Sequence, residues 1–308
     1  MGQTLYFVVA AASLLSITPQ MRALHVYTQA TTMTSAAHWA RVAFAGWVLA
    51  LTSDWLSPPA ESRWSDQMWY LACVLSLTPF AAALGAKRPG TRIWSVFVIL
   101  PLILVLEWPA LSRWNGLRPP EQLELEAPAL AALGLVLVMG TGNYLGTRYG
   151  WPVLGIVCGI VLQLTPLTEH TSPNTVPDLF WRAAACSCLA VSLWGLGRKT
   201  RQVPQHRGLE QLWSDFRDLF GIAWARRVQE QINAIARQEQ WGIQLDFQGF
   251  VQDSGAPVEG FSDRDQSQIE RAFRWSLRRF VDPEWIHARL AGSNTATADH
   301  VVDPPFEP

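Results

Sequence analysis

The sequence predicts an all-α polytopic membrane protein: seven transmembrane helices, then a small and mostly helical cytoplasmic tail. Seven apolar stretches fill the first 198 residues, and most of them are 17–20 residues long. That length suits the ~20 helical residues needed to cross ~30 Å of hydrocarbon. The basic residues of this region lie mostly in alternate loops. The last 110 residues hold 29 charged side chains, against 20 in the first 198, so the chain divides into an apolar and a polar part.

The predicted spans follow one another closely along the chain. They are residues 5–18, 39–56, 67–86, 93–111, 128–146, 151–167 and 179–196. The first span is short, and the second is interrupted by Arg41 and Asp54. Pro79 and Pro101 each remove a backbone donor inside a span, which predicts kinks in the third and fourth helices.

Charged residues in the loops indicate the orientation. The loops after spans one, three, five and seven, with the span ends beside them, contain nine basic residues and no acidic one: Arg22, Arg41, Lys87, Arg88, Arg92, Arg148, Arg198, Lys199 and Arg201. The alternate loops, residues 57–66, 112–127 and 168–178, contain three arginines and seven acids. Because cytoplasmic loops carry the excess of Lys and Arg, we expect the N-terminus outside and the C-terminus in the cytoplasm. The expected location is the bacterial inner (plasma) membrane.

The first span has a signal peptide as its alternative interpretation. Residues 1–4 contain no Lys or Arg, and no small-x-small cleavage site leads into a polar mature start. An uncharged leader followed by Arg22 favours a first helix whose N-terminus lies outside.

Two glycine patterns predict close helix packing in spans five and six. Gly142 and Gly146 form one G-x-x-x-G pair, and Gly155 and Gly159 form another. Glycine lets two helix backbones approach closely, so we interpret these spans as a tight hairpin that turns at residues 148–152.

Ionisable residues at the outer ends of the spans are the candidate ligand-binding group. They are Asp54, Glu107, Glu169, His170 and Arg182. Such a cluster could receive a cation or a polar substrate, with Arg182 balancing one carboxylate. The alternative is that they are interfacial residues that reach water and headgroups, and none of them lies near the middle of a span.

The sequence lacks the motifs of several kinds of chemistry. The segment 140–143 (GTGN) superficially resembles the G-x-G-D element of intramembrane aspartyl proteases, but Asn143 stands where the catalytic aspartate belongs. An amide cannot share a proton in a carboxylate dyad, which excludes that activity. The four cysteines lie within apolar stretches and form neither a C-x-x-C pair nor a loop framework, so we expect neither disulfides nor a metal site. We expect no cofactor, and the net charge of -1 gives no basic face for nucleic acid.

The tail has its own predicted elements after a polar linker, residues 199–208. Apolar residues recur every three or four positions from 209 to about 240, which predicts an amphipathic helix that bends at Gly221. Residues 243–248 alternate as a strand does, and such a strand needs a pairing partner, either residues 250–251 or another chain. Ser262 opens a predicted helix to about residue 280, and Asp282 opens a short final helix. We expect residues 291–308 to be disordered.

Two functions remain open on the sequence alone. The first is a membrane-anchored scaffold in which residues 209–290 dock on a protein partner or self-associate. Their apolar faces need a covering surface, which is either each other, a second copy or the membrane domain. The second is a transporter or intramembrane enzyme that acts on a lipid or small polar substrate at the outer ionisable group. The sequence contains no catalytic constellation, which favours the first function; membrane lipids are partners in both.

Overall fold

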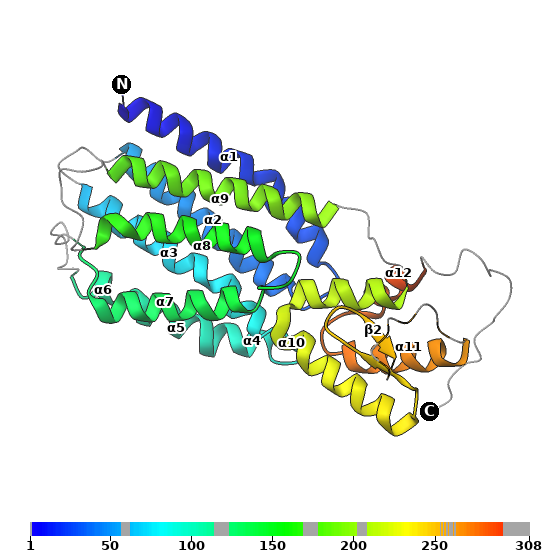
Figure 1. Cartoon of the computed structure of the whole chain (residues 1–308). Helices are drawn as coiled ribbons and strands as arrows, with labels where there is room; N and C mark the ends of the chain where they lie inside the picture. Colours follow the sequence, from blue (N-terminus) through cyan, green and yellow to red (C-terminus); the bar gives the residue numbers. More distant parts are fainter. Residues whose placement is uncertain are drawn as a thin grey trace.

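The computed structural model describes residues 2–56, 62–113, 123–168, 178–201, 208–252 and 263–291, together with residues 254, 256, 258 and 261. These parts of the chain are almost entirely helical, with one small two-stranded sheet (Figure 1). Four helical segments within them are long and apolar enough to cross a membrane: Gln3–Thr28, Trp64–Leu84, Gly150–Leu167 and Asp178–Lys199. The apolar segments Ser95–Leu106 and Ala127–Gly142 are shorter. The helices therefore indicate a membrane location.

The first three long helices are α1 (Gly2–Thr28), α2 (Thr34–Leu56) and α3 (Ser62–Leu84). α1 continues ten residues beyond the predicted span 5–18, and Pro19 does not end it. α2 and α3 pack along their length, with Trp47 and Trp69 edge to face at 5.4 Å between ring centroids. Aromatic pairs prefer this geometry, so the two rings stabilise the α2–α3 contact.

The predicted span 93–111 is broken into shorter pieces. It forms α4 (Thr91–Trp94), a π-helical turn η2 (Ser95–Ile99), α5 (Leu100–Leu106) and α6 (Trp108–Leu111). The π turn comes directly before Pro101, whose ring lacks an N–H and crowds the carbonyl four residues earlier. α3, in contrast, continues through Pro79 to Leu84.

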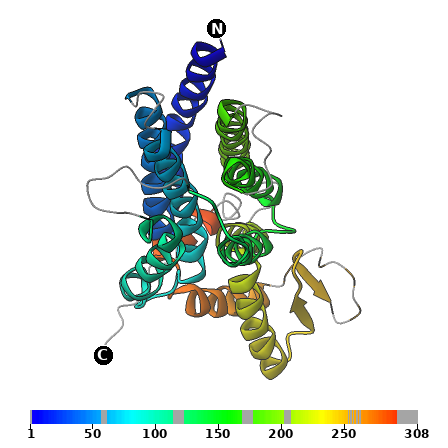
Figure 2. The same ribbon diagram turned by 90° about the vertical axis from the view of Figure 1, so that its left-hand side faces the viewer.

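Three further helices complete the bundle: α7 (Ala127–Gly142), α8 (Gly150–Leu164) and α9 (Asp178–Arg201). A 3-10 turn, η3 (Thr165–Leu167), extends α8. The most extensive packing joins α2 to α3, α8 to α9 and α1 to α9. In the end-on view, green α8 and α9 stand apart from blue α2 and α3 (Figure 2).

The four packing glycines have different surroundings from those expected. A Cβ added to Gly159 would lie 3.0 Å from the Leu189 side chain and 3.2 Å from the Ala185 carbonyl, and one added to Gly155 would meet Ser192. Both α8 glycines therefore face α9 rather than α7. A Cβ on Gly142 would meet nothing within 4 Å, and Gly146 has a φ of +85°, which fits a turn residue rather than a helix contact.

The C-terminal unit is our name for α10 to α12 with the sheet between them. α10 (Leu209–Glu239) bends at Gly221, where the sequence predicts it, because that residue has a φ of +78°. β1 (Ile243–Leu245) pairs antiparallel with β2 (Phe250–Gln252), which confirms the predicted hairpin. α11 (Asp263–Leu277) and α12 (Pro283–Leu290) follow.

Some predicted segments of the tail belong to α9 or lie outside the described residues. The expected linker 199–208 begins inside α9, which runs to Arg201. Residues 202–207, Ser262 and residues 292–308, with the disorder expected there, lie outside the described residues.

The apolar faces of the C-terminal unit are covered by one another and by the end of the bundle. Phe280 packs against Phe220 and Trp224 at 5.4 and 5.0 Å between centroids. The same buried cluster includes Phe80 and Tyr144 of the bundle. The Trp224 indole also donates a hydrogen bond to the carbonyl of Ala83, at 3.1 Å. Of the covering surfaces that the sequence leaves open, these contacts use the unit itself and the bundle.

Bundle loops hold the C-terminal unit through their backbone. The Thr32 amide donates to the carbonyl of Phe280 at 2.8 Å, and the Arg88 amide donates to that of Arg279 at 2.9 Å. Arg88 also forms a 2.6 Å ion pair with Asp282. The loops after α1 and α3 therefore lie at the same end of the bundle as the unit (Figure 1).

Candidate functional site

A buried ion-pair cluster lies at the end of the bundle opposite the C-terminal unit. Arg182, near the start of α9, lies between Asp54 of α2 and Asp66 of α3. Its Nη1 is 2.6 Å from Oδ1 of Asp54, and its Nη2 is 2.5 Å from Oδ1 of Asp66. The side chains of Arg182 and Asp54 are only 7% and 6% exposed, so solvent screens their attraction little. The rigid fork of guanidinium N–H groups allows Arg182 to bind both carboxylates.

Further donors surround Asp54. The Tyr6 hydroxyl and the Trp69 indole both donate to its Oδ2, at 2.5 and 2.9 Å. The Ser65 hydroxyl donates to its Oδ1 and accepts from Nη1 of Arg182, at 3.0 Å for the latter. These side chains join the four helices α1, α2, α3 and α9. We call them the Arg182 cluster, which consists of Tyr6, Asp54, Ser65, Asp66, Trp69 and Arg182.

The Arg182 cluster is suited to holding helices together. Both oxygens of Asp54 accept hydrogen bonds, and Arg182 contacts a carboxylate on each of two other helices, so the cluster ties α1, α2, α3 and α9 together. Nε of Arg182 has no hydrogen-bond partner among the described residues. Among those residues, no member of the cluster lines the cavity presented below.

The predicted ligand-binding residues are distributed as follows. Asp54 and Arg182 meet in the cluster. Glu107 lies between α5 and α6, where it is buried, and its Oε1 has no hydrogen-bond partner among the described residues. No hydrogen bond or ion pair in the described parts of the chain joins it to Arg182. Glu169 and His170 lie outside the described residues.

Sequence reasoning missed the remaining members of the cluster. Asp66 counts as a loop acid in a hydropathy analysis, and Trp69 counts as an interfacial aromatic. A signal for both exists in their spacing, since Ser65, Asp66 and Trp69 are separated by one and three residues and so share the first turns of α3. Tyr6 has no such signal, because its partner Asp54 is distant in sequence.

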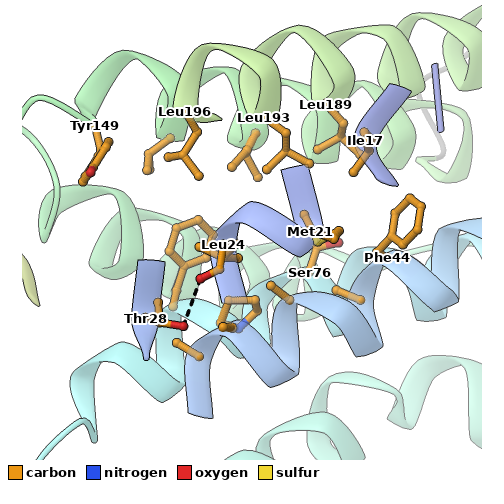
Figure 3. Close-up of a pocket in the computed structure, with 18 of the residues that line it drawn as sticks. Ile17, Met21, Leu24, Thr28, Phe44, Ser76, Tyr149, Leu189, Leu193 and Leu196 are labelled. Atoms are coloured by element: carbon orange, nitrogen blue, oxygen red, sulfur yellow. Dashed lines mark hydrogen bonds between the residues drawn. The ribbon is translucent and has the colours of Figure 1, made fainter. Parts of the chain in front are cut away.

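An apolar cavity lies between the two sides of the bundle. It contains about 1120 Å³ of empty space, including the part that opens outward. Leu189, Leu193 and Leu196 of α9 lie along one side of it, and Met21 of α1 and Phe44 of α2 lie on the other (Figure 3). Beside Phe44 and Trp47, α2 contributes four small residues to the wall: Ala36, Ala37, Ala40 and Ala43. This combination of long and short apolar side chains leaves the space open.

Polar groups gather at one end of the cavity. Tyr27 and Tyr149 both line it, and the Tyr149 hydroxyl donates to that of Tyr27 at 3.1 Å. Nη2 of Arg148 also donates to the Tyr27 hydroxyl, at 2.6 Å. Burial raises the pKa of Tyr149, so this phenol stays protonated at physiological pH.

Arg148 links that end of the cavity to α10. Its Nη2 is 3.0 Å from Oδ1 of Asp215, and its Nε is 3.3 Å from Oδ2 of Asp218. Arg289 of α12 binds the other oxygen of Asp215 at 2.8 Å. Both aspartates are almost fully buried, with side chains 8% and 3% exposed. A charge network therefore fixes α10 against the turn between α7 and α8.

Asn143 makes a second link between the same elements. Its backbone carbonyl accepts from the amide of Ile222 at 2.7 Å, and its Oδ1 accepts from that of Ala223 at 2.9 Å. Its Nδ2 donates to the carbonyl of Phe220 at 3.3 Å. Asn143 thus satisfies the backbone groups that the bend at Gly221 releases.

Comparison with models of protein families, with curated proteins and with solved structures finds no match to this chain. The geometry alone therefore defines the class: a mostly helical protein with apolar helices suited to a membrane, a buried charged cluster and an apolar cavity. Within the described ranges, no three His, Cys, Asp or Glu side chains group as a metal site requires.

Proposed function

We propose that the chain is a multi-pass protein of the bacterial inner membrane, with seven spans, its N-terminus outside and its C-terminal unit in the cytoplasm. Residues 1–198 form the membrane domain, and residues 209–290 form the cytoplasmic module. The distribution of basic residues supports this orientation, because Arg88 and Arg148 contact the C-terminal unit, whereas Asp54 and Asp66 lie at the other end.

Labelling with a membrane-impermeant maleimide tests the orientation. Glu124 lies before α7, at the end remote from the C-terminal unit, and Arg237 lies in the last turn of α10; both are exposed. In a cysteine-free background, we expect E124C to react in intact spheroplasts and R237C to react only after permeabilisation. The opposite labelling would reverse the proposed orientation.

Within that orientation, the function that the geometry supports best is binding of a membrane lipid by its hydrocarbon chain. The single observation that carries this function is the apolar cavity between α9 and the helices α1 and α2. Besides α2, its walls come from α1, α3, α8 and α9, which contain segments long and apolar enough to cross a membrane, so in the proposed orientation lipid surrounds this part of the bundle. A hydrocarbon chain in the cavity would give the lining side chains the dispersion contacts that they lack while the cavity is empty.

The polar end of the cavity suits the oxygen-bearing part of a lipid. Tyr27 accepts hydrogen bonds from Arg148 and Tyr149, and its own hydroxyl hydrogen is engaged by no acceptor among the described residues. That hydrogen is available to donate to an ester or carboxylate oxygen. The ligand would then lie with its chain along α9 and its oxygens near the C-terminal unit.

Lipid binding fits the structure better than the docking role expected for residues 209–290. That role draws its support from apolar faces without a covering surface, and α10 and α11 bury theirs within the unit and against the bundle. We also propose no ligand site at the outer ionisable residues, because Arg182 pairs with Asp54 and Asp66 and both oxygens of Asp54 already accept hydrogen bonds.

Two alanines of α2 provide a test with a matched control. Ala40 lines the cavity, whereas Ala45 is exposed on the same helix. Phenylalanine at position 40 should fill the space that the chain occupies, and A45F should leave it unchanged. We expect A40F to retain at least about fivefold less phospholipid per chain after detergent washing, measured by mass spectrometry, because a loss of about 1 kcal/mol weakens binding fivefold. Equal retention by the two variants would overturn the proposal.

A further inference from the structure

A second cavity lies where the loop after α3 meets the C-terminal unit. It contains about 540 Å³ of empty space, including the part that opens outward. None of its lining residues is acidic. Four of them are basic: Lys87 from the bundle loop, Arg227 from α10, and Arg278 and Arg279 after α11.

No carboxylate among the described residues neutralises these four side chains, since none of the four forms an ion pair there. The nearby Arg226 is paired with Glu230 instead, at 3.9 Å, and Asp282 is paired with Arg88. Four like charges that converge on one cavity repel one another, so an anion in the cavity lowers their energy.

Tryptophan rings hold three of the cations in place. The Trp224 ring centroid is 5.8 Å from Nζ of Lys87 and 5.0 Å from Cζ of Arg227. Cζ of Arg278 is 5.2 Å from the Trp275 centroid. Trp224 is itself anchored to the bundle by its hydrogen bond to Ala83. The cations are therefore positioned before any ligand arrives, which reduces the entropy that binding must overcome.

A buried hydroxyl group points to a ligand independently of the charges. Ser276 lines the same cavity and is only 5% exposed. Its Oγ has no hydrogen-bond partner among the described residues. A buried hydroxyl without a partner is costly, and an anion oxygen would accept its hydrogen bond.

We propose that this cavity, the Lys87–Arg227–Arg278–Arg279 cavity, binds a phosphate group. Arginine forks match phosphate oxygens in bidentate geometry, and lysine adds a point charge. The phosphate belongs either to an anionic lipid headgroup, which the cytoplasmic leaflet would supply, or to a soluble phosphate compound. This inference does not depend on the apolar cavity, which lies among the helices and has a different lining.

Titration of the purified full-length protein distinguishes the two sources. The probes are inorganic phosphate and dioctanoyl phosphatidylglycerol, each added in detergent at constant ionic strength, with thermal unfolding as the readout. Saturable stabilisation by the lipid but not by phosphate assigns a lipid headgroup, and saturable stabilisation by inorganic phosphate assigns a soluble ligand. Stabilisation by neither probe, or stabilisation that does not saturate with either probe, would overturn the proposal.

Variants locate the effect in the cavity. R278Q/R279Q should weaken binding of the effective probe at least about tenfold, since it removes two charge-assisted contacts. R237Q/R271Q is the matched control, because both of its arginines are exposed and neither lines the cavity. S276A changes no charge and should weaken binding as well, which keeps the test valid if the double variant fails to fold. Equal affinities of S276A and the control for the probe would contradict the assignment.

Discussion

At the scale of single residues, buried arginines decide how the helices meet. Arg182 neutralises Asp54 and Asp66, so that the three side chains join three different helices, and Arg148 neutralises Asp215 and Asp218 of α10. In both places one arginine bridges two carboxylates that are largely hidden from water, and at the second place Arg289 and Arg217 add further ion pairs. A charged side chain is costly to bury without a partner of opposite charge. Each arginine therefore stabilises the fold only while its helix and those of its carboxylates stay in contact.

Replacement of Arg182 should therefore destabilise the bundle strongly. R182A leaves the carboxylates of Asp54 and Asp66 buried without a cation, and we expect the free energy of unfolding to fall by about 3–5 kcal/mol. Denaturant unfolding of the full-length protein in detergent measures it. The control is R226Q, whose pair with Glu230 is 71% exposed on both sides and should contribute under about 1 kcal/mol. A loss no larger in R182A than in R226Q would show that the cluster is not structural.

Residue types alone indicate half of this arrangement. An ionisable side chain inside an apolar span is recognisable in the sequence, which singles out Asp54 and Arg182. Its partner is not recognisable when it lies beyond a loop, as Asp66 does, or on a distant helix, as Tyr6 does. Glu107 has the same sequence features as Asp54, yet it faces a different neighbourhood because α5 ends before it.

At the scale of elements, helix positions are easier to predict than helix contacts. Hydropathy locates α3, α8 and α9 well, because a stretch of about 20 apolar residues nearly always forms a membrane-spanning helix. It does not reveal the π turn at Ser95–Ile99, which depends on how the chain relaxes around Pro101. A G-x-x-x-G pattern also does not indicate which helix packs against it. Gly155 and Gly159 pack against α9, whereas the sequence interpretation paired their helix with α7.

The bend of α10 gives a prediction at this scale. A Cβ on Gly221 would lie 2.5 Å from the Asn143 carbonyl oxygen and would also collide with Nδ2 of Asn143. Gly242 has a similar φ of +68°, but a Cβ there would meet nothing within 4 Å. Both G221A and G242A incur the left-handed backbone cost of about 1–2 kcal/mol, and only G221A also separates α10 from the bundle.

Hydrogen exchange is the measurement for this pair of variants. We expect G221A to increase exchange in residues 209–239 and 143–150, and G242A to leave both segments protected. Equal protection in the two variants would mean that Asn143 does not hold α10.

At the scale of the whole molecule, the bundle and the C-terminal unit behave as one body with a hollow between its helices. The sequence indicates which faces of residues 209–290 are apolar, and it leaves open three surfaces that could cover them. The structure uses the end of the bundle, because Trp224 and Phe280 fit against Phe80 and Ala83. The apolar cavity could not be predicted, since empty space depends on the spacing of helices and leaves no trace in the order of residues.

The density map of the full-length protein in a lipid nanodisc, obtained by electron cryomicroscopy, tests the central claim most directly. The account predicts an elongated density between α9 and the α1–α2 pair that ends near the hydroxyl groups of Tyr27 and Tyr149. It would be contradicted by a collapsed cavity in which Leu193 contacts Phe44, or by a cavity that contains no continuous density.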